Sequence, residues 1–141
     1  MSKQKEVELQ PLNDSMDQAT MNQSQGDFRK TGNLTVAGNE SIVHEYADGC
    51  IYEGEWRSGH RYGKGMFKWP SGTKYTGEFR KDQRNGIGRI EYAKDGTKYK
   101  GQWKDDKRHG EGQFTWADGS FYKGDFVDDR MSGLGKLTWD T

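Results

Sequence analysis

The feature that most constrains this chain is a repeat of about 23 residues, a period typical of arrays built from one small structural unit. Each unit opens with Tyr-x-Gly-x-aromatic and continues with Gly-x-Gly followed by alternating apolar or aromatic positions. The opening tyrosines are Tyr52, Tyr75, Tyr99 and Tyr122. The second blocks begin at Gly63, Gly86, Gly110 and Gly133. Such units contact mainly their neighbours and stack along one axis.

Within each unit the recurring positions lie two residues apart, as in Tyr52-Glu-Gly54-Glu-Trp56. A period of two places them on one face of an extended strand. Polar turns such as residues 57–61 join the two strands of a unit. Ser-Gly or Asp-Gly pairs lead into the next unit, where glycine supplies the positive φ of a tight turn. We therefore predict an all-β fold, an elongated single-layer twisted array of antiparallel β-hairpins.

The glycines inside the predicted strands need an explanation, because glycine weakens a strand. They share a face with the recurring rings, so the missing Cβ leaves room for an aromatic ring from a neighbouring strand. Rings stacked over glycine would replace the aliphatic core that a chain with 30% hydrophobic residues cannot build. The glycines with this structural role are Gly54, Gly63, Gly65, Gly77, Gly86, Gly88, Gly101, Gly110, Gly112, Gly124, Gly133 and Gly135.

The segment before the repeats has a different composition. Residues 1–32 are rich in Gln, Asn, Ser and Asp, which predicts a mostly disordered tail or one that docks on a partner. Residues 33–51 are expected to form a degenerate capping hairpin and half a repeat. The four repeats that follow cover residues 52–74, 75–98, 99–121 and 122–141, the last of them truncated.

The repeat pattern of residues 46–141 resembles the MORN repeat (membrane occupation and recognition nexus). Tyr52-Glu-Gly54-Glu-Trp56, Gly63-Lys-Gly65-Met-Phe67-Lys-Trp69 and their equivalents carry the resemblance. It is closest in style to the repeat regions of radial-spoke head proteins and other cytoskeletal MORN proteins. The resemblance implies a non-enzymatic scaffold for protein–protein interaction. It also implies a cytoplasmic, cytoskeletal location in a large multi-subunit assembly, with the axoneme of a cilium or flagellum as the most specific expectation.

Composition and motifs argue against most other functions. Basic and acidic residues balance at 22 each, which does not favour nucleic-acid binding. The polar N-terminus predicts no secretory signal, and no apolar run approaches the length of a membrane span. His44, His60 and His109 lack partners at metal-ligand spacing, and Cys50 is the single cysteine. We predict no catalytic residue, no metal site, no cofactor and no enzymatic activity.

Two parts of the array are candidates for protein binding. The face that carries the opening rings would offer an aromatic trough to a helix or extended segment. Alternatively, packing between repeats uses these rings up. They are Tyr52, Trp56, Tyr75, Phe79, Tyr99, Trp103, Tyr122 and Phe126. The C-terminal strand, with Leu137 and Trp139, would present an uncapped edge to another chain, including a second copy.

Basic residues at equivalent positions of the hairpin turns form a third candidate surface. They are Arg57, Arg61, Lys81, Arg84, Lys104, Lys107, Arg108 and Arg130. Interleaved aspartates favour an ion-paired, solvated edge. The alternative is a peripheral membrane module that makes weak, salt-sensitive contacts with acidic phosphoinositides. A regulatory fragment of a larger enzyme is a further alternative, suggested by the truncated last unit.

Overall fold

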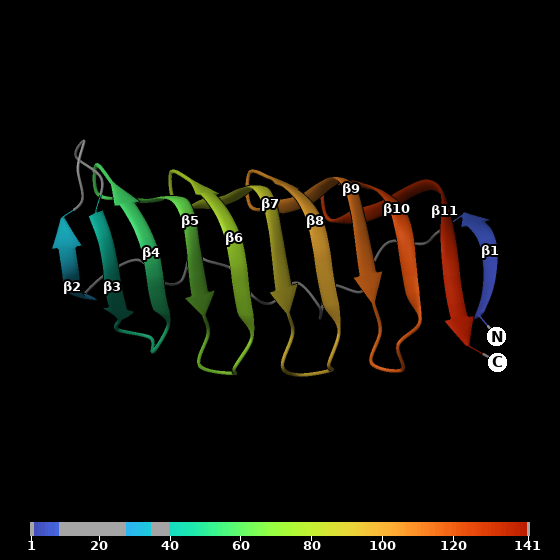
Figure 1. Ribbon diagram of the computed structural model, residues 1–141, viewed down its shortest axis with the longest axis horizontal. Coiled ribbons are helices and arrows are strands. Elements are labelled where there is room, and N and C mark those ends of the chain that lie inside the picture. Colours follow the sequence, from blue (N-terminus) through green and yellow to red (C-terminus); the bar gives the residue numbers. More distant parts are fainter. Residues whose placement is uncertain (1, 9–27, 35–39, 141) are drawn as a thin grey trace.

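The computed structural model describes residues 2–8, 28–34 and 40–140. Their strands form one antiparallel sheet of 11 strands in the order β1-β11-β10-β9-β8-β7-β6-β5-β4-β3-β2, side by side along the long axis (Figure 1). The strands are β1 (Ser2–Glu8), β2 (Phe28–Leu34), β3 (Glu40–Tyr46), β4 (Ile51–Arg57), β5 (His60–Lys68), β6 (Lys74–Arg80), β7 (Gln83–Glu91), β8 (Lys98–Lys104), β9 (Lys107–Thr115), β10 (Phe121–Val127) and β11 (Arg130–Asp140). None of the described residues lies in a helix, so no helix there could cross a membrane. The predicted all-β, single-layer hairpin array is confirmed.

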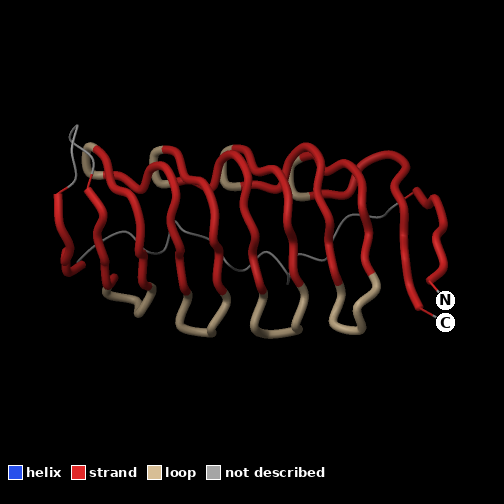
Figure 2. Tube along the Cα trace, viewed as in Figure 1, coloured by secondary structure: helices blue, strands red, loops and turns tan. Residues whose placement is uncertain are grey.

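Each repeat is one hairpin, β4–β5, β6–β7, β8–β9 or β10–β11. The two residues at each hairpin turn have positive φ, for example 50° at Lys81 and 70° at Asp82. This is the backbone of a two-residue turn that matches strand twist. Between repeats, Gly72 and Gly96 have φ of 97° and 73°, as the predicted turns require. Figure 2 shows that the loops gather along the two long edges of the sheet.

The core consists of aromatic rings that interlock from one repeat to the next. The ring of Tyr52 meets that of Phe79 edge-on, with centroids 5.2 Å apart. Tyr75 and Trp103 repeat this contact one unit later at 5.3 Å. Edge-on ring pairs of this kind add stability beyond the area that they bury. The recurring tyrosine of one repeat therefore packs against the aromatic residue of the next.

The second glycine of each Gly-x-Gly block makes room for a ring, as predicted. The prediction is wrong for the first glycines, Gly63, Gly86, Gly110 and Gly133: a Cβ there would meet Glu55, Glu78 or Gln102, or nothing at Gly133, and these positions need glycine for their positive φ. A Cβ at Gly65 would lie 2.6 Å from Cε1 of Tyr52, and one at Gly88 would meet the ring of Tyr75. Gly54, Gly65 and Gly77 are paired with one another across neighbouring strands. The glycines thus form a continuous row across the sheet, and we call it the glycine row.

The N-terminal part adds β3 and β2 at one edge of the repeat array and β1 at the other. A hairpin of β2 and β3 covers the β4 edge, pairing from Phe28↔Tyr46 to Leu34↔Glu40. It begins earlier than the predicted capping hairpin of residues 33–51, because most of β2 lies in the predicted tail, and residues 35–39 lie outside the described part of the chain. Within the predicted tail, Ser2–Glu8 forms β1, while residues 1 and 9–27 lie outside the described part of the chain. β1 pairs with β11, with Lys5 opposite Leu137 and Lys3 opposite Trp139. The prediction of an open C-terminal edge is therefore wrong, because the chain's own first strand lies along it.

Candidate interaction surface

The face that carries the opening rings is the interior of this protein. The eight rings predicted to form a docking trough are all buried, and Trp56, with 8% of its surface exposed, is the most accessible of them. The ring-to-ring contacts between repeats and the room above the glycine row explain this burial. The prediction that these rings form a docking face is therefore wrong. They form the core and leave little surface for a partner.

The tyrosine hydroxyls of this core are also occupied. Those of Tyr52, Tyr75 and Tyr99 donate hydrogen bonds to backbone carbonyl oxygens three residues later, at 2.5, 2.7 and 2.7 Å. Burial raises the pKa of each of these hydroxyls well above its ordinary value, because the phenolate would lose its hydration. These tyrosines are neutral structural groups at physiological pH.

Three of the basic turn residues, Arg61, Arg84 and Arg108, are buried as well. Each lies nine residues after its opening tyrosine and reaches an aspartate in the next repeat. Nε of Arg84 donates to Asp106 at 2.6 Å, and its Nη2 donates to the backbone carbonyl of the same residue at 2.9 Å. Its guanidinium also lies 4.6 Å from the ring centroid of Trp103.

The other two arginines make the same backbone contact, to Asp82 at 3.1 Å and to Asp129 at 3.2 Å. We call these pairs the arginine clamps. They correct the prediction that Arg61, Arg84 and Arg108 contact an anionic surface, because each instead joins two consecutive repeats. The turn sequence alone does not distinguish an arginine that folds back over the rings from one that points into water.

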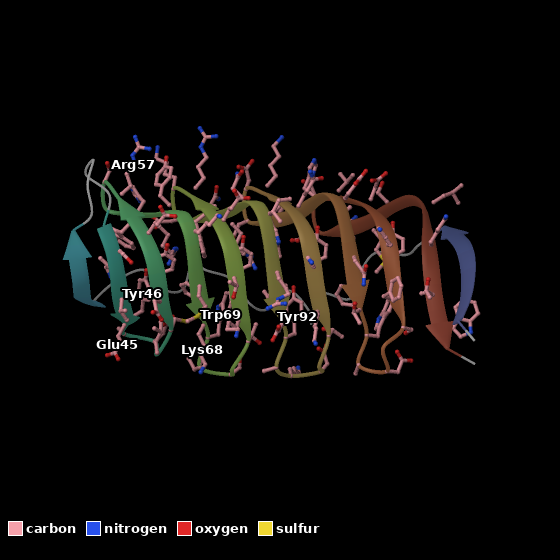
Figure 3. All side chains as sticks on the ribbon, in the orientation of Figure 1. Glu45, Tyr46, Arg57, Lys68, Trp69 and Tyr92 are labelled. Atoms are coloured by element: carbon pink, nitrogen blue, oxygen red, sulfur yellow. The ribbon has the colours of Figure 1, made fainter. Side chains whose placement is uncertain are left out.

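The remaining basic turn residues are exposed, and they are Arg57, Lys81, Lys104, Lys107 and Arg130. Figure 3 shows Arg57 at one long edge of the sheet, opposite the edge that carries Glu45 and Lys68. Exposed carboxylates at Asp105 and Asp128 lie in the same turns. This edge is a mixture of both charges, in which each exposed pair contributes little.

A stronger concentration of charge lies on the outer face, the side of the sheet whose side chains alternate with the buried rings. Strand register aligns its residues in rows across the sheet. Two neighbouring rows contain the basic residues Lys68, Lys74, Arg89, Lys98, Lys100, Lys123 and Lys136, which we call the basic band. From β4 to β11 the same two rows hold only two carboxylates, Glu53 and Glu91.

The basic band places like charges directly opposite one another. Lys68 pairs with Lys74, and Lys123 pairs with Lys136. Arg89 likewise pairs with Lys100, although its Nε also lies 3.4 Å from a carboxylate oxygen on its own strand. Like charges that face each other across strands destabilise a sheet. Of these six residues, only Lys74 and Lys136 have a residue of opposite charge in register on their other side, Glu91 of β7 and Glu6 of β1. The basic band is therefore the candidate interaction surface of the sheet.

A groove runs between the basic band and a second row of polar residues. Near the C-terminal repeats it encloses about 840 Å³. Lys100, Lys123 and Lys136 line one side, and the opposite side includes Glu111 and Asp125. Glycines of the glycine row form part of its lining. A groove with glycines at its base, lysines on one side and carboxylates on the other can receive an extended segment or one face of a helix.

Apolar contacts are available at the same groove. Its lining includes Ile87 and Leu134, whose surfaces are 53% and 68% exposed. They are the two most exposed large hydrophobic residues in the part of the chain where burial is described. A segment lying in the groove would bury these two side chains.

Sequence reasoning missed this site because it treated the residues between the recurring positions as generally solvated. The signal lies in comparing one such position across units. The residue after each opening tyrosine is Glu53, Thr76, Lys100 and then Lys123. This position therefore becomes basic toward the C-terminal repeats, and strand pairing places its lysines side by side in the basic band.

The described residues offer little for metal or nucleophilic chemistry. They contain no group of three or more His, Cys, Asp or Glu side chains that could hold a metal ion. Nδ1 of His60 lies 2.5 Å from Asp82, where it helps to fix the turn of the next repeat. Cys50 is buried. These residues support the turns and the core.

The family model for the MORN repeat matches residues 52–74, 75–97, 99–121 and 122–141. Alsin from Homo sapiens and from Rattus norvegicus, and the ALS2 C-terminal-like protein from Bos taurus, are each 44% identical to this chain over 39 residues. The aligned stretch is 28% of this chain, but only 2% of Alsin and 4% of the ALS2 C-terminal-like protein. The match thus spans a small fraction of the length of these curated relatives.

Proposed function

Because this chain belongs to the MORN-repeat family, we propose that it is a non-enzymatic scaffold that binds a protein partner on the outer face of its sheet. The observation that carries this proposal is the basic band, with its like-charged pairs beside an open groove. The proposed partner is an acidic protein segment. Its carboxylates would relieve the repulsion along the band, and an apolar side chain would cover Ile87 or Leu134.

The charge of the band also sets the expected behaviour of binding. Complementary charge mainly raises the association rate and fixes the orientation of the partner. Each exposed ion pair contributes about 0.2–1 kcal/mol, so several must act together with the apolar contacts. We therefore expect binding to weaken strongly as salt rises.

At the cellular level, we propose that the chain is a subunit of a large cytoskeletal or ciliary assembly in the cytoplasm. The axoneme, in a radial-spoke-like complex, is the most specific form of this proposal. The resemblance to cytoskeletal MORN proteins supports it, and so does the elongated shape, which presents one long surface to neighbouring subunits.

The experiment compares two triple charge reversals. The test variant is Lys100→Glu/Lys123→Glu/Lys136→Glu, and the control is Arg57→Glu/Lys104→Glu/Arg130→Glu at the turn edge. Both invert three exposed basic residues and change the net charge equally. Each tagged protein is expressed in cells with motile cilia, and the co-purifying proteins are quantified by mass spectrometry.

We expect the test variant to lose its most enriched wild-type partners at least about tenfold, while the control retains them. Thermal melts check that both variants fold. The reversal turns Arg89↔Lys100 into an opposite-charge pair and leaves 123↔136 a like-charge pair, so we expect stability to change little. Equal retention by both variants, or equal loss, would contradict binding at the basic band. Enrichment without cytoskeletal or ciliary proteins would contradict the proposed assembly.

A second candidate function is a peripheral membrane module that binds acidic phosphoinositides. The observation in its favour is again the basic band, in place of the turn arginines that proved to be buried. Vesicles with and without phosphatidylinositol bisphosphate test it by co-sedimentation at rising salt. A protein-binding surface predicts weak sedimentation that disappears with salt. Sub-micromolar binding that survives half-molar salt would favour the membrane role.

A third candidate, a regulatory fragment of a larger enzyme, makes a separate prediction for the co-purification experiment. It requires an enzyme among the partners that the chain enriches, with an activity that changes when the chain is added. A scaffold requires neither.

A further inference from the structure

The strands that precede the repeats lie at opposite edges of the sheet. β1 pairs with β11 from Ser2↔Asp140 to Glu8↔Leu134, whereas β2 pairs with β3 at the other edge. Figure 1 accordingly shows both chain termini at the β11 end. A strand edge exposes unpaired backbone groups that can template pairing with another chain. The N-terminal strands therefore cover two surfaces that would otherwise be open to self-association.

The strand β1 is chemically different from the strand that it covers. Its sequence is SKQKEVE, in which Val7 is the one aliphatic residue. Opposite it, β11 contributes Leu134, Leu137 and Trp139. A short polar strand with lysines is the type that proteins place at a sheet edge to prevent further pairing. β1 thus shields a more apolar strand without offering an equally attractive edge of its own.

The position of β1 also limits how firmly it can be held. Ten strand spacings of about 4.8 Å separate β1 from β2, a distance of about 48 Å. Residues 9–27 join them, and a chain of that length reaches about 65 Å when fully extended. Closing a connection at so large a fraction of its reach costs conformational entropy and lowers the effective concentration of β1 at β11.

We propose that β1 is a displaceable cap and that the edge of β11 beneath it is a dimerisation surface for a second copy of this chain. This inference is independent of the protein partner proposed for the outer face. Two copies of β11 related by a two-fold axis pair antiparallel and form a closed dimer. Such a two-fold pair uses the single free edge of each β11, so the association through β11 stops at two copies.

One register of the β11–β11 pair suits the side chains. When it is centred on Leu137, each Leu137 faces its counterpart and Lys136 faces Thr138. Trp139 then faces Gly135, which repeats the ring-over-glycine contact of the core. A register centred on Lys136 would place two ammonium groups opposite each other, which is unfavourable. The self-complementary register therefore joins apolar residues on the ring face and separates the lysines.

The test uses the full chain with β1 weakened in place. The variant Lys5→Pro/Glu6→Pro removes two consecutive backbone N–H groups. Successive N–H groups of a strand point to opposite sides, so one of the two must face β11. The matched control, Lys5→Ala/Glu6→Ala, keeps both. Molar mass is measured by light scattering over a range of concentrations, and thermal melts show whether the repeats remain folded.

We expect the proline variant to dimerise with a dissociation constant at least about tenfold below that of the alanine control, because a lost ladder hydrogen bond and a proline clash both weaken the pairing of β1 with β11. Adding Leu137→Lys to the proline variant should restore the monomer. A proline variant that stays monomeric, or one that forms larger species, would overturn the proposal. So would dimerisation of the alanine control to the same degree.

Cysteine cross-linking tests the register independently. In the proposed dimer the two copies of residue 137 have Cα atoms roughly 4.5–5.5 Å apart, within reach of a disulfide. Leu137→Cys in the proline variant should therefore form a covalent dimer on oxidation, whereas Lys136→Cys should not. The buried Cys50 is common to both. A covalent dimer through residue 136 alone would refute this register.

Discussion

Replacing Gly101 by valine tests the ring-over-glycine core most directly. A Cβ at this position would lie 2.5 Å from the carbonyl oxygen of Glu111, 2.5 Å from Cα of Gly112 and 2.8 Å from the hydroxyl of Tyr99. Two of these atoms belong to the backbone of the neighbouring strand and cannot move aside. Overpacking of this kind costs about 1–3 kcal/mol. Displacing Tyr99 also breaks its 2.7 Å hydrogen bond to Gln102, a loss of about 1 kcal/mol.

The expected loss for Gly101→Val is therefore about 2–4 kcal/mol, which corresponds to a fall in melting temperature of roughly 8–16 °C for a domain of this size. The control is Lys100→Val, one residue earlier on the exposed outer face. There valine favours a strand and relieves the repulsion from Arg89, so stability should change by about 0.5 kcal/mol or less. Circular dichroism melts and urea titrations measure both variants. Equal losses, or a larger loss for Lys100→Val, would show that the assignment of the two faces is wrong.

Three further predictions concern the clamps, the core tyrosines and the basic band. Arg84→Met should destabilise the protein by about 2–4 kcal/mol in urea titrations, because Asp106 loses its buried partner; an unchanged midpoint would mean that the clamp contributes nothing. Burial raises the pKa of the Tyr75 hydroxyl in the folded state. The stability that depends on this neutral hydroxyl is therefore complete below the pKa of about 10 in the unfolded chain. Above that pH the free energy of unfolding falls by about 1.4 kcal/mol per pH unit. Urea titrations between pH 9 and pH 11 should therefore show a smaller loss of unfolding free energy for Tyr75→Phe than for the wild type. Lys123→Glu should raise the melting temperature slightly at low salt, since it faces Lys136, and the gain should vanish at high salt.

The hairpin array could be predicted because its evidence is local. The spacing of two in Tyr52-Glu-Gly54-Glu-Trp56 determines which residues share a face, whatever the neighbouring strands do. Whether that face is core or surface depends on how the repeats twist against one another, and the sequence leaves both alternatives open. The burial of Phe79 against Tyr52 decides between them, since it is a contact between two repeats.

The arginine clamps and β1 show two other limits. Arg61 lies beside a polar hairpin turn, where an exposed basic residue is the common case, and only its constant offset from the opening tyrosine indicates a shared role. β1 carries no such signal, because its sequence is polar and its partner β11 lies at the other end of the chain. Pairing over that separation depends on the geometry of the whole sheet and cannot be read from either segment alone.

The arginine clamps also give the array a direction, because the arginine of each clamp always belongs to one repeat and the aspartate to the repeat that follows it. The second and third repeats carry both halves, an arginine and the aspartate that receives the arginine of the repeat before. The first repeat has Ser58-Gly59 in the receiving turn, and the fourth has Met131 at the arginine position. The two middle repeats are therefore the modules that can be duplicated to lengthen the array, whereas a unit added after the fourth would first require Met131→Arg.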